Sequence, residues 1–546
     1  MASKLEVQVG RPWTGLGGAY ARGEPNALRW YAGNWQDPDA WRTRAREVAE
    51  RFTPDMRARS VELLDAPARA TREKLRRVAA GDGFMVSTGQ QPGLFTGPGY
   101  TLLKALSTVA LARWLEGLLA VPVVPVFWVA SEDHDWAEVD HVDLVGADNE
   151  LHRVSLPQPA GAGAQPLHRL PLGTGVESAL DEFAGLLPQT EFTSEYLGVL
   201  RETWRPGVTI NDGVRTTLGN LLGDHGVAFL DAADPVLKGR SVPVLEAELR
   251  GAGAHEAGLA ARGAELRASG WPLQVPILEE GVNLFVEGPA GRERLYRSGE
   301  VFRLRKSGTP LALDDLFARL RSEPSTISPN VLLRPVVEAS VLPTLGFVTG
   351  PGETAYHAQL APLFASHATP QPLVFPRFSV TLVEGKVAKV LDNLDLDVAS
   401  LAHPVHELMV RLAREEMPEP VTRALAELRT ALDRGTAELV EASRPVDPTL
   451  AGPISHARSV TLAALRVTER KILQAVKRRN ETRLQQLEKA RVHLFPRGAP
   501  QERVASPLYY LVRYGPSLLE ELLEHFARNL PVPGAADYVA SSATPE

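Results

Sequence analysis

Three carboxylates and an imidazole occupy four consecutive positions of the chain, from Glu132 to Asp135. Like charges packed together raise the pKa of one carboxyl group and of a neighbouring histidine. The cluster could bind Mg²⁺ through Glu132 and Asp133, or it could hold His134 as a general base that an acid orients. A helix cap with solvated acids is the alternative. We favour function and take Asp133, His134 and Asp135 as candidate catalytic residues.

A glycine- and proline-rich segment from Ser87 to Tyr100 is the second place where chemistry could occur. Glycines let a backbone approach a ligand closely, and the N-terminus of a following helix favours anions. The glycine spacing fits neither a P-loop nor a dinucleotide-binding fingerprint, and a long structural turn is an equal alternative. The polar run Thr-Gly-Gln-Gln favours a binding site. Its candidate residues are Thr88, Gly89, Gln90, Gln91, Gly93, Thr96 and Gly97.

A third candidate is the turn from Thr349 to Glu353, which repeats the Thr-Gly-Pro-Gly of residues 96–99. Two strand ends with the same turn could face one ligand, although a repeated structural turn would give the same pattern. Upstream, Arg334 follows an apolar run and could grip a carboxylate or phosphate bidentately, or form a structural ion pair. The candidate binding residues of this region are Asn330, Arg334, Gly350, Gly352, Glu353 and Tyr356.

Apolar runs that precede these segments predict the elements that position them. Residues 84–88 are predicted to form a short apolar strand. Residues 121–130 are apolar at nearly every position, as is typical of a strand buried on both faces, and a helical pattern over 100–116 lies between the two. Strand–helix–strand spacing indicates a parallel sheet, which further strands at 227–231 and 342–348 would extend. Ligands in open α/β folds bind at the carboxyl edge of the sheet. We therefore expect the three polar segments to converge on one cleft.

Other parts of the chain carry helix and hairpin signals. Residues 1–80 are expected to be mostly helical, with helix starts at Asp37 and Thr53. Residues 275–278 and 283–286 are predicted to pair as a hairpin around Glu279-Glu280-Gly281. One or two strands are expected within 373–383.

From about residue 400 the pattern becomes helical and charged. Leucines at three- and four-residue steps, with Gly435 in one slot, form a heptad seam. A second long helix over 454–493 would complete an antiparallel helical hairpin. The tail from Pro531 is expected to be frayed. The seam residues are Leu425, Leu428, Leu432 and Leu439.

Composition restricts the function classes. The chain has 546 residues, 44% hydrophobic and 23% charged, with a net charge of −7, which predicts two to four globular units and no nucleic-acid partner. The absence of cysteine excludes disulfides, a thiolate nucleophile and any cysteine-ligated metal. The N-terminus lacks the apolar core of a signal peptide, and 121–130 is too short for a membrane helix, which needs roughly twenty residues. We expect a cytoplasmic protein without a membrane partner.

Three segments strongly resemble the bacillithiol biosynthesis cysteine-adding enzyme family, BshC. They are STGQQPGLFTGPGYTLLKALS, VPVVPVFWVASEDHDWAEVDHV and SPNVLLRPVVEASVLPTLGFVTGPGETAYHAQL. The resemblance implies an α/β fold with a Rossmann-like parallel-sheet core similar to nucleotidyltransferases, inserted connecting segments and a C-terminal antiparallel coiled coil that forms a homodimer. The expected units are a helical segment at 1–80, a core at 81–400 with insertions near 150–220 and 250–325, the coiled coil at 401–500, and a C-terminal helix with tail at 501–546.

The resemblance also implies a reaction, in which a ligase joins the carboxyl of L-cysteine to the amine of glucosaminyl-malate to form an amide. Because a free carboxylate is a poor electrophile, cysteine would first become an acyl-adenylate or an acyl-phosphate, with ATP or another nucleotide as cofactor and Mg²⁺ as a candidate metal. Of the nucleotidyltransferase signature His-x-Gly-His, only Gly97 is present, and Glu338 stands where the family usually has glutamine. The alternatives are another nucleotide-dependent transferase, or a non-catalytic dimeric binding protein of the thiol pathway.

Overall fold

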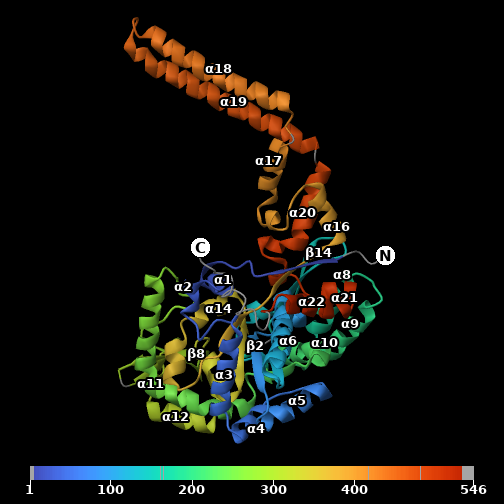
Figure 1. Ribbon diagram of the computed structural model, residues 1–546, viewed down its shortest axis with the longest axis vertical. Coiled ribbons are helices and arrows are strands. Elements are labelled where there is room, and N and C mark those ends of the chain that lie inside the picture. Colours follow the sequence, from blue (N-terminus) through green and yellow to red (C-terminus); the bar gives the residue numbers. More distant parts are fainter. Residues whose placement is uncertain are drawn as a thin grey trace, which may run out of the picture. The chain divides into compact units, whose positions relative to one another are not determined.

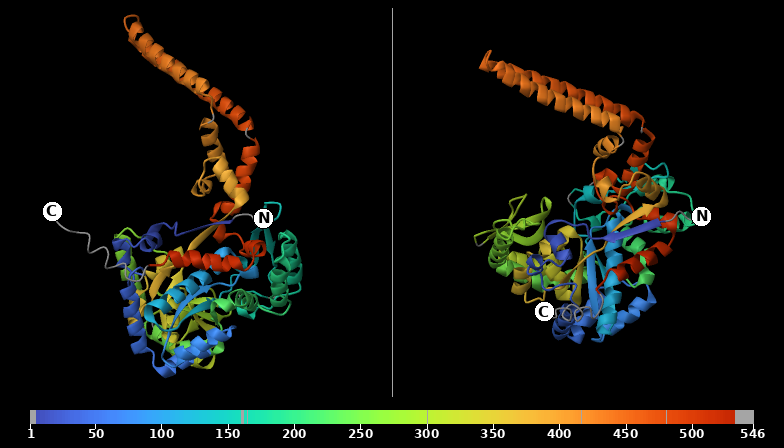
Figure 2. Two further views of the ribbon diagram at one scale, coloured as in Figure 1. Left: turned by 45° about the vertical axis from the view of Figure 1, so that its right-hand side comes forward. Right: turned by 45° about the horizontal axis from the view of Figure 1, so that its top comes forward.

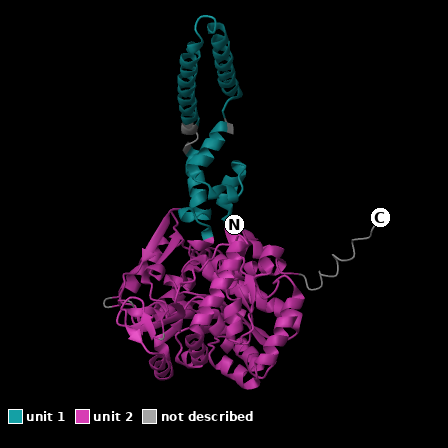
Figure 3. Ribbon diagram, turned by 90° about the vertical axis from the view of Figure 1, so that its left-hand side faces the viewer, with its two compact units in different colours: residues 1, 3–6, 383–501 teal, residues 2, 7–382, 502–546 magenta. Residues whose placement is uncertain are grey.

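The computed structural model describes residues 5–159, 162–163, 165–299, 301–415, 417–479 and 481–531. It divides the chain into two compact units, shown in different colours in Figure 3. The larger unit comprises Val7–Leu382 and the segment that starts at Glu502, and the smaller unit is built mainly from Val383–Gln501. The tail that was expected to fray lies outside the described residues from position 532 onward.

A five-stranded parallel sheet forms the centre of the larger unit, in the order β13–β12–β2–β3–β6. The predicted parallel sheet is therefore confirmed. The chain runs from β2 to β3 and β6 on one side and then returns to β12 and β13 on the other, so the strand order reverses between β2 and β12. The strands are β2 (Phe84–Gln90), β3 (Val123–Val129), β6 (Ala228–Asp231), β12 (Thr344–Thr349) and β13 (Leu373–Pro376).

Helices cover both faces of this sheet. Helix α6 (Gly99–Leu119) packs on β2 and β3 (Figure 1). Leu75 of α5 (Arg69–Ala79) belongs to a buried cluster with Val124 and Trp128, which point to one side of β3. All residues of β3 are buried, which explains the unbroken apolar run in its sequence.

The N-terminal part is mostly helical, as predicted, but it begins with a strand. The predicted helix starts are confirmed, because Asp37 accepts a hydrogen bond from the backbone N–H of Asp39 and Thr53 accepts one from Met56. The elements are β1 (Leu5–Gly10), α1 (Gly15–Ala21), α2 (Pro25–Leu28), α3 (Pro38–Arg51), α4 (Pro54–Glu62) and α5. Between β3 and β6 the chain forms α7 (Trp136–Val139), β4 (His141–Val145), β5 (Leu151–Ser155), α8 (Gly175–Leu186), α9 (Thr193–Thr203) and α10 (Ile210–Leu222).

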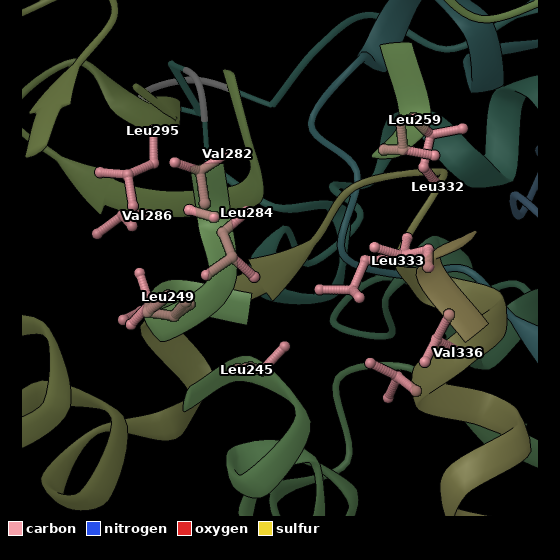
Figure 4. Packing of buried hydrophobic residues seen from close by; sticks show 14 of the residues in the cluster. Leu245, Leu249, Leu259, Val282, Leu284, Val286, Leu295, Leu332, Leu333 and Val336 are labelled. Carbon is pink, nitrogen blue, oxygen red and sulfur yellow. The ribbon is translucent and has the colours of Figure 1, made fainter. Parts of the chain in front are cut away.

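A second, antiparallel sheet has the order β10–β9–β8–β7–β11 and packs on the long helix α11 (Pro235–Ala268). Figure 4 shows Leu245 and Leu249 of this helix beside Val282 and Leu284 of the sheet. The strands are β7 (Gly281–Gly288), β8 (Gly291–Ser298), β9 (Val301–Leu304), β10 (Pro310–Leu311) and β11 (Ile327–Pro329). The remaining helices of the larger unit are α12 (Leu313–Ser322), α13 (Arg334–Val341), α14 (Pro351–His357), α15 (Ala361–Ser366), α21 (Leu508–Tyr514) and α22 (Ser517–Arg528).

The predicted hairpin between 275–278 and 283–286 is wrong. Strand β7 pairs instead with β8, across a turn at Pro289 and Ala290. The backbone of Val275 cannot join a ladder, because the side chain of Gln359 takes both of its hydrogen bonds, at 3.1 Å to the N–H and 2.9 Å to the carbonyl.

Among its described residues, the smaller unit is helical apart from the start of β1 and the end of β14 (Ser379–Glu384). Its helices α18 and α19 lie side by side and antiparallel in Figures 1 and 2, and ion pairs join Arg429 to Glu469 and Arg458 to Asp433. The predicted helical hairpin is thus present, although its second helix is described as two pieces, α19 and α20. The helices are α16 (Gly385–Asn393), α17 (Val405–Glu415), α18 (Glu419–Ser443), α19 (Ala451–Arg479) and α20 (Glu481–Leu494). Among the described residues, no helix is both long and apolar enough to cross a bilayer.

Candidate functional site

A cavity of about 600 Å³ lies at the carboxyl edge of the parallel sheet, where β2, β3 and β12 end. This is the place where the strand order reverses, and open α/β folds bind their ligands at such points. Gln90, His134 and Gly352, one from each polar segment, line the same cavity. The predicted residues that line it are Gly89, Gln90, Gln91, Glu132, Asp133, His134, Asn330, Arg334, Gly350, Gly352, Glu353 and Tyr356.

Two other predicted residues lie outside the cavity. The hydroxyl of Thr88 donates to the backbone carbonyl of Val348 at 2.8 Å and is buried, so it joins β2 to β12. Asp135 is exposed at the N-cap position of α7, where its side chain makes no capping hydrogen bond.

The remaining three, Gly93, Thr96 and Gly97, belong to a tight buried turn instead of the cavity wall. Phe95 and Thr96 have φ of 48° and 75°, conformations that side chains rarely adopt. The ring of Phe95 packs against Phe183 and Trp204, with centroids 5.1 and 5.2 Å away. A Cβ on Gly93 would lie 3.1 Å from the Cα of Gly97. Gly93 and Gly97 therefore allow two parts of the backbone to pack closely together and do not contact the cavity.

An ion pair between Lys104, which is buried, and Glu353, which is partly exposed, joins the two sides of the reversal point. The ammonium of Lys104 on α6 lies 2.6 Å from Oε2 of Glu353 and also contacts the carbonyl of Gly89. Burial lowers the pKa of Lys104, and Glu353 opposes that shift. Burial would raise the pKa of Glu353, but Lys104 and the Gly350 N–H, 2.8 Å away, bring it below its usual value. Glu353 is therefore ionised at neutral pH. Lys104 was missed, although a lysine within the apolar run Leu102–Val109 is a signal.

Arg334 forms the ion pair that the sequence left as an alternative, and it also lines the cavity. Its Nη1 lies 2.7 Å from Oε2 of Glu338. Burial works against the charge of Arg334, but Tyr356 and Glu338 together hold its pKa above the usual value, so it stays cationic. Burial raises the pKa of Glu338 and raises that of Tyr356 to about 12.

Two carboxylates of the acidic cluster, Asp133 and Glu132, have different partners. Asp133 accepts hydrogen bonds from the side chain of Gln91 at 2.5 Å and from the N–H of His134 at 2.8 Å. Nδ1 of His134 is buried, lies 3.5 Å from Oδ1 of Asp133 and has no hydrogen-bond partner in the described part of the chain. Glu132 instead pairs with the buried ammonium of Lys238 at 2.5 Å. Only Asp133 is thus placed to orient His134.

Asn330 has a structural task at the cavity wall. Its side-chain oxygen accepts from the N–H groups of Leu332 and Leu333, at 2.9 and 3.0 Å, just before α13 begins. Its amide nitrogen donates to Asn283 at 3.0 Å. Asn330 therefore fixes the segment that carries Arg334.

Arginines that the sequence analysis overlooked complete the wall. Arg292 and Arg294 alternate on β8 with the buried residues Glu293 and Leu295, a period-two pattern that could have signalled them. The guanidinium of Arg292 lies 3.9 Å from the centroid of the Phe285 ring. Burial lowers the pKa of Arg292, and the carboxylates of the acidic cluster oppose that shift.

Two more arginines reach the cavity from the C-terminal part of the larger unit. Arg377, just after β13, is held by Glu502 through two hydrogen bonds of 2.9 and 2.6 Å. Arg503 is exposed and lies 6.0 Å from the centroid of the Tyr100 ring. In the described residues, Arg503 has no ion pair, and neither has Arg292 or Arg294 of β8.

The charge balance of the cavity favours anionic ligands. Six basic side chains but only three carboxylates line it. Since three of the arginines have no carboxylate partner within the described ranges, they are free to bind carboxylate or phosphate groups.

The architecture and this cavity define a Rossmann-like α/β protein that carries a helical coiled-coil unit and an arginine-rich cavity. Residues 4–378 match the family model "Bacillithiol biosynthesis BshC, N-terminal Rossmann-like domain", and residues 380–529 match "Bacillithiol biosynthesis BshC, C-terminal coiled-coil domain". The chain belongs to the BshC family.

Curated relatives agree with that assignment over most of the chain. A protein of Salinibacter ruber is 33% identical over 90% of both chains. One of Symbiobacterium thermophilum is 33% identical over 83% of this chain and 84% of its own, and one of Heliobacterium modesticaldum is 30% identical over 95% and 97%. Each of these relatives carries the name "Putative cysteine ligase BshC".

Proposed function

We propose that this chain is a cytoplasmic ligase that joins the carboxyl group of L-cysteine to the amine of glucosaminyl-malate, forming the amide bond of bacillithiol. The observation that carries the proposal is the arginine-rich cavity at the reversal point of the sheet, in a chain of the BshC family. Each substrate bears carboxylates, and the chain itself has no cysteine, so the thiol of the product would come from the substrate alone.

Arg292 and Arg334 are the residues we assign to the malyl carboxylates. A guanidinium binds a carboxylate through two parallel hydrogen bonds and remains charged when buried. Arg334 is prepositioned by Glu338, and Arg292 is held by the hydroxyl of Ser328 at 2.9 Å. The two side chains would thus orient the sugar substrate without large rearrangement.

His134 is the group we assign as general base. The attacking amine must lose a proton, and a positioned imidazole is the side chain that most often acts as a general base. The carboxylate of Asp133, 3.5 Å from Nδ1, would stabilise the imidazolium that forms. Gln91 holds that carboxylate in place.

A nucleotide would supply the leaving group that makes the cysteine carboxyl reactive. Arg294 and Arg503 fit its phosphates, because both line the cavity and have no carboxylate partner in the described ranges. The acidic cluster does not fit a magnesium site built by protein alone. Lys238 neutralises Glu132, and Gln91 holds Asp133, so none of the roles proposed here depends on the ion.

Product analysis tests the proposed reaction. The purified full chain is incubated with L-cysteine, glucosaminyl-malate and ATP, and the product and released nucleotide are identified by mass spectrometry. We expect the amide, together with AMP for an acyl-adenylate or ADP for an acyl-phosphate. The ligase assignment fails if no amide forms with any nucleoside triphosphate, and sugar transfer from a nucleotide donor would favour a transferase instead. Binding of the substrates without turnover would favour a non-catalytic binding protein.

A homodimer through the coiled coil is part of the same proposal. Leu428 and Leu439 of the heptad seam are 56% and 54% exposed in the single chain, and exposed leucines at heptad spacing are typical of helices that pair with another chain. Light scattering of the purified protein should give twice the chain mass. Leu428→Glu combined with Leu439→Glu should give one chain mass, and an unchanged mass would place the interface elsewhere.

A further inference from the structure

Glu248 and His255 of α11 form a buried cluster with His367, which follows α15, apart from the residues that line the cavity. Their side chains are 0%, 7% and 1% exposed. Oε2 of Glu248 lies 2.7 Å from Nδ1 of His255 and 3.8 Å from Nε2 of His367. The potential ligand atoms of the three side chains all lie within 4.8 Å of one another.

The ring nitrogen Nε2 of His367 faces this cluster with an unprotonated lone pair. Its Nδ1 lies 2.9 Å from the carbonyl of Leu363, which can only accept, so Nδ1 carries the hydrogen of the neutral ring. Nε2 is then an acceptor, and it is buried without a hydrogen-bond partner in the described structure. Nε2 of the neutral ring and the carboxylate of Glu248 are then two acceptors that face each other, 3.8 Å apart, in the protein interior.

We propose that Glu248, His255 and His367 bind one divalent transition-metal ion of the Zn²⁺ type. Zinc bonds to histidine and carboxylate measure about 2.0–2.2 Å, which places neighbouring ligands of a tetrahedral site roughly 3.3 Å apart. The observed separations of 2.7 and 3.8 Å lie on either side of that value. Two imidazoles and one carboxylate suit Zn²⁺, Co²⁺ or Ni²⁺ better than Mg²⁺ or Ca²⁺, which prefer all-oxygen sites.

The groups around the cluster behave as the outer shell of a metal site. The Leu363 carbonyl orients His367, as backbone carbonyls orient metal-binding imidazoles. The other oxygen of Glu248 accepts from the N–H and the side-chain amide of Asn283, at 3.0 and 2.9 Å. Leu245 and Leu249, on either side of Glu248 in α11, form part of the surrounding apolar core (Figure 4).

Hydrogen bonds connect these outer-shell groups to the wall of the cavity. Asn283 accepts from Asn330, which fixes the start of α13. The ion would thus have a structural role, joining α11, the segment after α15 and the β7 strand. It does not depend on the proposed ligase activity.

Metal titration of the untagged full chain tests this site. The protein is stripped with a chelator, and Zn²⁺ retained after dialysis is measured by elemental analysis. Co²⁺ is then added and its visible spectrum recorded. We expect one equivalent of tightly held ion, ligand-field bands of tetrahedral intensity, and a higher thermal unfolding midpoint with Zn²⁺ than without.

Variants separate this site from surface binding. His367→Gln should weaken Zn²⁺ binding by at least about 100-fold, whereas His152→Gln, in the exposed cluster with Asp148 and Glu150, should leave the tight equivalent unchanged. Retention of tight zinc by His367→Gln, or its loss in His152→Gln, would overturn the proposal. If His367→Gln does not fold, the spectrum of the wild-type chain still decides. An octahedral Co²⁺ spectrum, or less than a tenth of an equivalent bound, would refute the site.

Discussion

Lys104 of helix α6 and Glu353 in the first turn of α14 form an ion pair, with Nζ and Oε2 2.6 Å apart. The pair bridges the carboxyl ends of β2 and β12 at the place where the strand order reverses. Since Lys104 also contacts the carbonyl of Gly89, a single side chain connects two of the three polar segments that surround the cavity.

Removing one partner of this pair should destabilise the larger unit more than removing both. Glu353→Met would leave the buried ammonium of Lys104 without its carboxylate, at a cost of about 3–5 kcal/mol in the free energy of unfolding. The double variant Lys104→Met/Glu353→Met should recover part of that loss. Urea unfolding of the three proteins measures the effect. Additive losses would show that the two side chains are not coupled.

Arg292 should determine binding of the sugar substrate. Arg292→Gln removes one guanidinium–carboxylate contact, so we expect KM for glucosaminyl-malate to rise about 10- to 100-fold, with KM for cysteine little changed. Arg303→Gln is the matched control, because Arg303 is exposed on the neighbouring strand β9 and lies outside the cavity lining. Equal effects of the two substitutions would remove Arg292 from the binding site.

His134→Asn should lower kcat for amide formation by about 100- to 10,000-fold. Asp133→Asn should have a smaller effect in the same direction, because the carboxylate acts through the imidazole. Steady-state kinetics of both variants and the wild type measure the effect. A wild-type kcat in His134→Asn would eliminate the residue as the base.

For Asp135, the prediction from sequence and the structure disagree: the sequence marks it as catalytic, but the structure places it outside the cavity. Its exposed side chain lies outside the cavity lining, so we expect Asp135→Asn to change kcat less than about threefold. A 100-fold loss would restore Asp135 to the catalytic set.

Acid should destabilise the protein through His357. Burial lowers the pKa of this side chain to about 3, against 6.5 when unfolded, so the folded state binds fewer protons than the unfolded state. The stabilisation is fully present above pH 6.5 and is lost as the pH falls towards 3, by about 1.4 kcal/mol per unit. Between pH 7.5 and 5, His357→Gln should lose about 2 kcal/mol less unfolding free energy than wild type. Parallel losses would exclude this residue as the cause.

The sequence predicts the sheet and the location of the site better than it predicts which residues line the site. The run 121–130 predicts a strand buried on both faces, which places the polar residues after it at the carboxyl edge of the sheet. Phe95 shows the limit: its glycine-rich turn has the composition of a ligand loop, but its ring is buried against helices that lie about a hundred residues later in the chain.

Lys104 and Arg292 illustrate what local patterns cannot supply. Both acquire their roles from tertiary partners, since Glu353 lies far along the chain from Lys104 and the strand of Arg292 belongs to a different sheet from the acidic cluster. Periodicity identifies which face of an element is apolar, but it does not identify the charged groups that another element brings to that face.

The ion pair between Glu502 and Arg377 has a consequence for how the chain folds during translation. Glu502 belongs to the larger unit but lies after the whole helical unit in the chain. A ribosome therefore has to translate the entire coiled coil before the Rossmann-like domain receives the carboxylate that neutralises Arg377. Until Glu502 has been translated, the nascent sheet therefore lacks the ion pair that fixes Arg377. Truncation before Glu502 should consequently yield an aggregation-prone product instead of a stable shortened enzyme.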